Sequence, residues 1–194
     1  MIRQEGTPAC SLHIGTHNVN GALASVKERD ACKIRSLVRL WCQLDLAIIC
    51  VQETHLTKDT AGSCERIMNE TAERIHRPGW VTWWSHHTRS SAGVGIIIRR
   101  DLVSSGVIKI RKNRAGRTDI DEEVAGRVIQ LAVDWGGHKL NVGCMYLPSG
   151  DCLGQRTAIT THLGPLAVTC RSPIWAGDYN FVGNVDLDRI RGGG

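Results

Sequence analysis

Apolar residues recur with the spacing of an amphipathic helix in three segments of the chain. In the first segment, positions i, i+3, i+4 and i+7 are all apolar: Ile34, Leu37, Val38 and Trp41. This spacing predicts a helix over about residues 30–43, with Asp30 as its N-terminal cap. The same period predicts helices over residues 64–75, ended by Pro78, and over residues 159–166.

Short apolar runs bounded by Gly, Asn or charged residues predict strands between and after these helices. The predicted strands cover residues 11–16, 44–51, 81–84, 93–99, 106–110, 127–133, 139–147 and 173–176. The run over residues 44–51 is nearly all apolar, which suits a central strand covered on both faces. Two glycines in a row between Trp135 and His138 predict a hairpin turn.

This order of elements favours an α/β fold. Strands connected by helices alternate with strands connected by hairpins, which is typical of a layered sandwich with the helices packed outside the sheets. The 194 residues contain no linker, repeat or composition change that would divide them. We therefore expect an N-terminal tail over residues 1–10 and one domain over residues 11–194.

Composition excludes several classes of protein. With 42% hydrophobic and 22% charged residues the chain is globular rather than disordered. Its longest apolar runs, such as residues 46–51 and 94–98, are far shorter than the ~20 residues that span a bilayer, and the N-terminus does not resemble a secretory signal. The eight cysteines show no Cys-x-x-Cys spacing. We expect an intracellular protein, nuclear or cytoplasmic, with reduced thiols and no membrane or disulfide-linked partner.

The positive charge is concentrated in one part of the chain. The formal net charge is +5, and residues 99–117 carry seven basic side chains and one acid, Asp101. Two interpretations stay open for this basic stretch: a solvated rim of a hairpin, or a surface that contacts an anionic partner such as DNA.

Polar side chains with oxygen atoms follow predicted apolar strands. They are Asn18, Glu53, Asp178 and Asn180. Open α/β sheets bind ligands at such strand ends, and carboxylate and amide oxygens are the hard donors that Mg²⁺ prefers. The alternative is that each residue caps a helix or closes a turn.

Six motifs, in this order, resemble those of the endonuclease/exonuclease/phosphatase superfamily. They are His17-Asn-Val-Asn-Gly21, Ile48-Ile-Cys-Val-Gln-Glu-Thr-His-Leu56, Gly93-Val-Gly-Ile-Ile-Ile98, Gly126-Arg-Val-Ile129, Val142-Gly-Cys-Met-Tyr-Leu-Pro148 and Gly177-Asp-Tyr-Asn180. Within the superfamily the chain is most similar to the apurinic-type endonuclease domain of non-LTR (LINE-type) retrotransposons. The resemblance implies a four-layered α/β sandwich of the DNase I-like type and hydrolysis of DNA phosphodiester bonds, as in nicking of a target site.

The resemblance also implies roles for individual residues. The implied catalytic residues are Glu53, Tyr146, Asp178 and Asn180, and the implied metal-binding residues are Asn18 and Glu53. The metal would be Mg²⁺, with Mn²⁺ able to replace it. By the family pattern Asp178 orients or activates the attacking water, while Tyr146 and Asn180 lie at the scissile phosphate. The residues expected to contact DNA are Asn20 and Arg127 from the motifs, and Arg111, Lys112 and Arg114 from the basic stretch.

The chain departs from the family at its C-terminal end. The family pattern continues with a Ser-Asp-His element, whereas only fourteen residues follow Asn180 here and none is histidine. We therefore expect a fold that is incomplete at that end and hydrolysis weakened on the order of 10²- to 10⁴-fold. The alternatives are an apurinic repair nuclease or other phosphoesterase, or a catalytically inactive fragment. A full-length element would fuse the domain to a reverse transcriptase.

Overall fold

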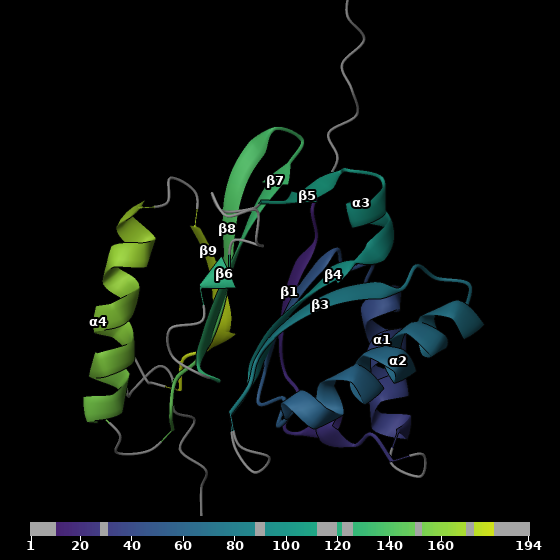
Figure 1. Cartoon of the computed structure of the whole chain (residues 1–194), viewed down its shortest axis with the longest axis horizontal. Coiled ribbons are helices and arrows are strands. Elements are labelled where there is room, and N and C mark those ends of the chain that lie inside the picture. The colour runs from purple at the N-terminus through teal and green to yellow at the C-terminus, as the bar shows by residue number, and fades with distance from the viewer. Residues whose placement is uncertain are drawn as a thin grey trace, which may run out of the picture.

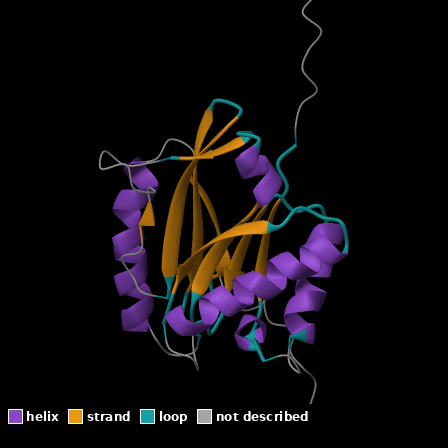
Figure 2. Cartoon of the chain, turned by 45° about the vertical axis from the view of Figure 1, so that its right-hand side comes forward, coloured by secondary structure: helices purple, strands orange, loops and turns teal. Residues whose placement is uncertain are grey.

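Two mixed β-sheets pack face to face between helices in the computed structural model (Figure 1). The structure describes residues 11–27, 31–87, 92–111, 120–121, 126–149, 153–169 and 173–180. Figure 2 shows that the helices lie outside the strands on both sides. The predicted α/β sandwich with external helices is confirmed. No helix among the described residues has the length and apolar character needed to cross a bilayer.

The first sheet has the strand order β1-β2-β4-β3. Its strands are β1 (Ile14–Asn18), β2 (Ile48–Gln52), β3 (Trp80–Ser85) and β4 (Val94–Arg99). β1 and β2 are parallel, and the other pairs are antiparallel. Every residue of β2 is buried, because Ile49 and Val51 face the helices while Ile48 and Cys50 face the second sheet. The expected central strand covered on both faces is confirmed.

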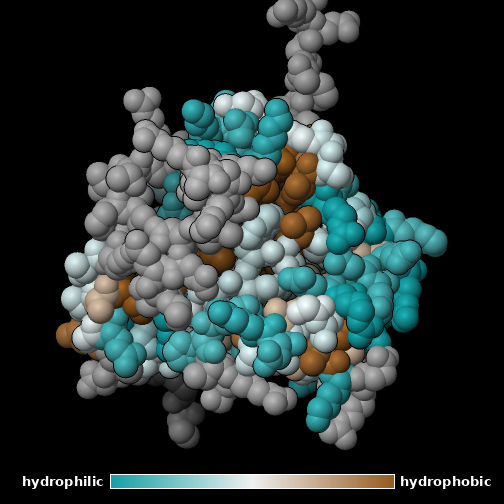
Figure 3. Space-filling model, viewed as in Figure 1, coloured by the Kyte–Doolittle hydropathy of each residue, from teal (hydrophilic) through white to brown (hydrophobic). Residues whose placement is uncertain are grey.

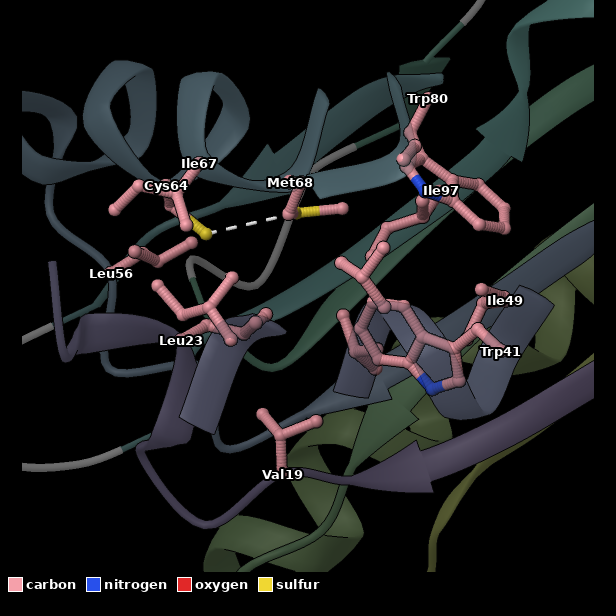
Figure 4. Close-up of a cluster of buried hydrophobic side chains, with 14 of the residues drawn as sticks. Val19, Leu23, Trp41, Ile49, Leu56, Cys64, Ile67, Met68, Trp80 and Ile97 are labelled. Atoms are coloured by element: carbon pink, nitrogen blue, oxygen red, sulfur yellow. Dashed lines mark hydrogen bonds between the residues drawn. The ribbon is translucent and has the colours of Figure 1, made fainter. Parts of the chain in front are cut away.

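The helices on the first sheet are α1 (Cys32–Gln43) and α2 (Lys58–Arg74), with a short 3₁₀ helix, η1 (Ala22–Ala24). Their apolar faces enclose a core around Trp41, Met68 and Trp80 (Figure 4). On the face in Figure 3, hydrophilic residues gather over α1 and α2, as amphipathic helices require.

Both helices differ from the prediction at their N-terminal ends. The N-cap of α1 is Ala31, and Asp30, the predicted cap, lies outside the described residues. α2 starts at Lys58 rather than near residue 64, because Thr57 and Thr60 form a capping box in which each side chain bonds the other residue's backbone.

The second sheet has the order β5-β7-β8-β9, with β6 also paired to β7. The strands are β5 (Ile108–Ile110), β6 (Ile120–Asp121), β7 (Val128–Trp135), β8 (His138–Tyr146) and β9 (Pro173–Asp178). The predicted hairpin joins β7 to β8, with positive φ at Gly136 (55°) and Gly137 (85°). β8 and β9 are parallel. The short β6 and helix α3 (Arg100–Ser104) carry too few residues to show a period, and the sequence did not predict them.

The two sheets bury one apolar layer between them, built from residues such as Ile96, Leu131 and Val142. Helix α4 (Leu153–Thr169) covers the outer face of the second sheet, where Ile159 packs near Met145 and Trp175. The layers are therefore helix, sheet, sheet, helix. This stacking brings β1 next to β9 and β2 next to β8, so the carboxyl ends of four strands meet at one edge of the molecule.

Candidate active site

Four polar side chains lie at these strand ends. Asn18 is the last residue of β1, Glu53 directly follows β2, Tyr146 ends β8 and Asp178 ends β9. Tyr146 and Asp178 are paired across β8 and β9. Because each residue closes an element fixed by a hydrogen-bonded ladder, the backbone at each position is held in place. The structure thus brings together residues that are 160 positions apart in the sequence.

The amide of Asn18 bridges two carboxylates. Its Nδ2 donates to Asp178 Oδ2 at 2.8 Å and to Glu53 Oε1 at 3.2 Å. Its Oδ1 accepts a hydrogen bond from the backbone N–H of Asn20 at 3.0 Å. The amide therefore presents its nitrogen to the acids, and the first sheet is tied to the second at this point.

Asp178 is also held by its neighbour Asn180. The backbone N–H of Asn180 donates to Asp178 Oδ1 at 3.1 Å, and its Nδ2 donates to the Leu147 carbonyl at 2.8 Å. Both carboxylate oxygens of Asp178 thus accept a hydrogen bond, which fixes the orientation of the group.

The backbone turns sharply after these strands. Positive φ angles occur at Asn20 (45°), Glu53 (52°), His55 (51°) and Asn180 (46°). Asn adopts this left-handed conformation readily, whereas Glu and His rarely do. At Glu53 the turn is held by the hydrogen bond from the Gly21 N–H to the Glu53 carbonyl at 2.7 Å. Such conformations cluster at functional sites because the surrounding structure compensates their cost.

Tyr146 lies beside Glu53 and under the guanidinium of Arg127. Burial, together with the hydrogen bond to Glu53 and the negative charges of Glu53 and Asp178, raises the pKa of Tyr146 to about 12, although the charge of Arg127 opposes this. Tyr146 is therefore a neutral phenol at physiological pH. The Arg127 Cζ lies 4.9 Å from the ring centroid, within the range of a cation–π contact.

Gln52 directly precedes Glu53 and holds the end of β2 in place through its side-chain hydrogen bonds. The sequence motifs predicted no role for it. It is buried between the sheets, and its Nε2 lies 3.1 Å from Thr16 Oγ1, 3.0 Å from the Cys50 carbonyl and 3.1 Å from Cys144 Sγ. The sequence feature that could have indicated this role is an amide at the end of an otherwise apolar, fully buried strand, because a buried polar group needs hydrogen-bond partners.

The basic stretch does not join this cluster where the structure describes it. Arg111 follows β5 at the edge of the second sheet, and its Nη1 lies 3.5 Å from Asn141 Oδ1. Asn141 precedes Tyr146 by five residues of β8, about 17 Å at strand spacing. Arg99 instead forms ion pairs with Asp45 and Asp101. Lys112 and Arg114 lie outside the described residues.

The donor set fits a cation that takes few protein ligands. Among the described residues no group of three or more His, Cys, Asp and Glu side chains could hold a metal ion. Mg²⁺ is usually held by one or two carboxylates, with water and substrate phosphate completing its shell. Glu53 supplies one such carboxylate, and Asp178 lies next to it on the same Asn18 amide. Both are hard oxygen donors, which suit Mg²⁺ better than a soft metal.

Solved structures resemble the chain where sequence comparison finds nothing. No family model matches the chain. No curated protein matches it either. An AP endonuclease from Archaeoglobus fulgidus matches with a TM-score of 0.59 and 18% identity, over 90% of this chain and 59% of that chain.

Two further structures agree with this match. D. rerio TDP2, complexed with single strand DNA product, has a TM-score of 0.57 and 17% identity, over 91% of this chain and 63% of that one. An endonuclease/exonuclease/phosphatase family protein from Leptotrichia buccalis has a TM-score of 0.59 and 20% identity, over 91% and 71%. The chain thus spans about two thirds of the length of these structures. It shares with these structures the two-sheet α/β architecture of the DNase I-like fold.

Proposed function

We propose that the chain is a Mg²⁺-dependent nuclease that hydrolyses phosphodiester bonds of DNA, as in target-site nicking by a non-LTR retrotransposon. The observation that carries the proposal is the Asn18 bridge between Glu53 and Asp178 at the strand ends, with Tyr146 bonded to the same Glu53. This arrangement gathers two acids, an amide and a neutral phenol around one point that solvent can reach. It suits a phosphate group that arrives as part of a long polymer.

In this proposal each residue acts through the contacts described above. Glu53 holds Mg²⁺, Asn18 orients the two carboxylates, and Asp178 orients a water molecule and accepts its proton. The water oxygen bonds to phosphorus as the bond to the leaving 3′ oxygen breaks, and Tyr146 and Asn180 contact the phosphate. When bound, the ion supplies positive charge against the negative charge that develops on the phosphate oxygens.

Contacts with the DNA backbone would come from Asn20 and Arg127 at the site. Asn20 is exposed beside Asn18, and the Arg127 Nη1 is a buried donor without a hydrogen-bond partner, which a phosphate oxygen would satisfy. Arg111, Lys112 and Arg114 would extend the contact along the edge of the second sheet. The retrotransposon assignment rests on the sequence of residues 52–57 and of the tail residues 177–182 and 187–189, which resemble that family.

Nicking of supercoiled plasmid in Mg²⁺ tests the proposal. We expect the wild-type chain to nick, and Glu53→Ala and Asp178→Ala each to lose on the order of 10²- to 10⁴-fold in rate. Glu73→Ala, which removes an exposed carboxylate on α2, is the matched control and should nick like wild type. A folded wild-type chain that leaves the plasmid supercoiled in Mg²⁺ and in Mn²⁺ would contradict the proposal.

The second candidate is an apurinic repair nuclease, because an AP endonuclease is among the structures with this fold. Cleavage of two duplex oligonucleotides separates the two functions. A target-nicking enzyme cuts intact duplex at preferred sequences, whereas a repair enzyme cuts the duplex with an abasic site far faster than the intact one. We expect the first result.

A further inference from the structure

We propose that Arg127 is a positioning residue, which holds the Tyr146 ring so that its hydroxyl group stays on Glu53. The inference rests on the proposed function for the role of Glu53, and it adds a task for Arg127 inside the protein, separate from any contact with DNA. Arg127 directly precedes β7, Tyr146 ends β8 and Glu53 follows β2. The three residues therefore connect the second sheet to the first.

The contact between Arg127 and Tyr146 is the first link. The guanidinium carbon lies over the ring at 4.9 Å from its centroid, and Tyr146 is only 9% exposed. Cation–π attraction increases when the ring is withdrawn from water. A guanidinium is planar and can lie flat on the ring, whereas a lysine ammonium is a compact, strongly hydrated charge. Lysine at this position would keep the charge and lose the flat contact.

The orientation of Arg127 is set by this ring rather than by an acid. Among the described residues no carboxylate forms an ion pair with Arg127, and its Nη1 is buried without a hydrogen-bond partner. The residue before it is fixed to the first sheet. The Gly126 N–H donates to the buried Ser85 Oγ at 2.7 Å, and the Gly126 carbonyl accepts from Gly93 at 2.9 Å. The backbone that carries Arg127 is thus fixed, and its guanidinium group packs on the Tyr146 ring.

The hydrogen bond between Tyr146 and Glu53 is the second link. The Tyr146 backbone is held independently, because its N–H donates to the Arg127 carbonyl at 2.8 Å. A change of the Arg127 side chain therefore frees the Tyr146 ring without releasing the strand. Glu53 would then keep the bond from Asn18 and lose the one from Tyr146, so that its carboxylate would no longer be fixed on both sides.

Nuclear magnetic resonance of tyrosine-labelled protein tests the first link directly. The chain has two tyrosines, so Tyr179→Phe leaves Tyr146 as the single labelled ring. We expect Arg127→Lys and Arg127→Met each to shift or broaden the Tyr146 ring signals. In Arg127→Ala, added guanidinium ions should restore them and added methylammonium should not. Arg66→Met, on the exposed surface of α2, is the control that leaves them unchanged.

Mn²⁺ binding, measured by electron paramagnetic resonance, and nicking kinetics test the second link. Arg127→Lys and Arg127→Met should each bind Mn²⁺ about tenfold more weakly, as is typical when the partner of a metal ligand is lost, and should lower kcat more than they raise KM. Unchanged Tyr146 signals and Mn²⁺ affinity, with only KM for DNA raised, would overturn the inference and leave Arg127 as a DNA contact. If wild type neither nicks nor binds Mn²⁺ while the Tyr146 signals still follow Arg127, the proposed function fails and the positioning role stands.

Discussion

At the scale of single residues, the neutral phenol of Tyr146 is the group whose environment the structure defines most sharply. It is buried, bonded to Glu53 and close to the charge of Asp178, and its pKa is raised to about 12. A tyrosine hydroxyl group already keeps its hydrogen at physiological pH, and the raised pKa extends this range to alkaline pH, so Tyr146 donates to Glu53. Phenylalanine would remove this donor and leave the ring under Arg127.

The pKa of Tyr146 gives a prediction at alkaline pH. The folded-state value lies above the unfolded value of about 10. The stability that Tyr146 contributes is therefore fully present below pH 10 and is lost as the pH rises through about 12. Near-ultraviolet absorbance against pH should show one fewer late-ionising tyrosine in Tyr146→Phe. A Tyr146 that ionises near pH 10 in the folded chain would show that its bond to Glu53 does not form.

At the scale of elements, local chemistry decides where each helix and strand begins. The long apolar runs predicted β2 and β4, because burial on both faces leaves a clear pattern, and two consecutive glycines predicted the hairpin of β7 and β8. The predicted start of α2, near residue 64, lies beyond the observed start at Lys58, because the capping box at Thr57 contains no apolar residue. The five-residue α3 and the two-residue β6 are too short to show a sequence period and depend on contacts with other elements, so no window of sequence could reveal them.

Part of the candidate site could be predicted because the apolar strands that position it have a clear sequence pattern. Asn18, Glu53 and Asp178 each stand at the end of an apolar strand, and their type and position together indicated one cluster. The Tyr146 and Arg127 pair came from resemblance to a family and not from pattern. The supporting bonds of Gln52 and Ser85 reach across the two sheets, and such partners are defined only when the sheets are packed.

The hairpin between β7 and β8 gives a prediction at this scale. Both turn residues have positive φ, as a type I′ turn requires, and a Cβ at either position would meet no atom within 4 Å. Gly137→Ala should therefore lower the free energy of unfolding by about 1 kcal/mol through backbone strain alone. Gly136→Asn should change it by less than about 0.5 kcal/mol, because Asn-Gly suits this turn. Urea unfolding of the two variants measures the difference.

At the scale of the whole molecule, the layered fold determines where the charged side chains lie and which of them are free to bind a partner. The two sheets enclose one apolar layer and the helices cover further ones, and the polar groups of the site gather at the edge where four strands end. Part of the positive charge of the basic stretch is used within the protein, since Arg99 is paired with two acids. The cationic groups left for DNA are therefore fewer than the sequence count of 24 Lys and Arg indicates.

The salt dependence of DNA binding tests this view. Each phosphate contact should add about −0.9 to the slope of log K against log salt concentration. Arg127→Met should make that slope shallower by about 1 if its Nη1 binds a phosphate. Fluorescence anisotropy with a labelled duplex measures both values, and Arg66→Met should keep the wild-type slope. An unchanged slope in Arg127→Met would remove this residue from the DNA contacts.

The left-handed backbone conformation after the strands lowers the stability of the fold at the same residues that form the candidate site. Glu53 and His55 adopt positive φ angles that cost an ordinary residue about 1–2 kcal/mol and glycine almost nothing. Glycine at position 53 would therefore relieve strain while deleting the carboxylate that joins Asn18 and Tyr146. A directed-evolution library selected only for heat resistance would enrich such glycines and erase the site. Selection on this fold has to include a chemical readout from the first round.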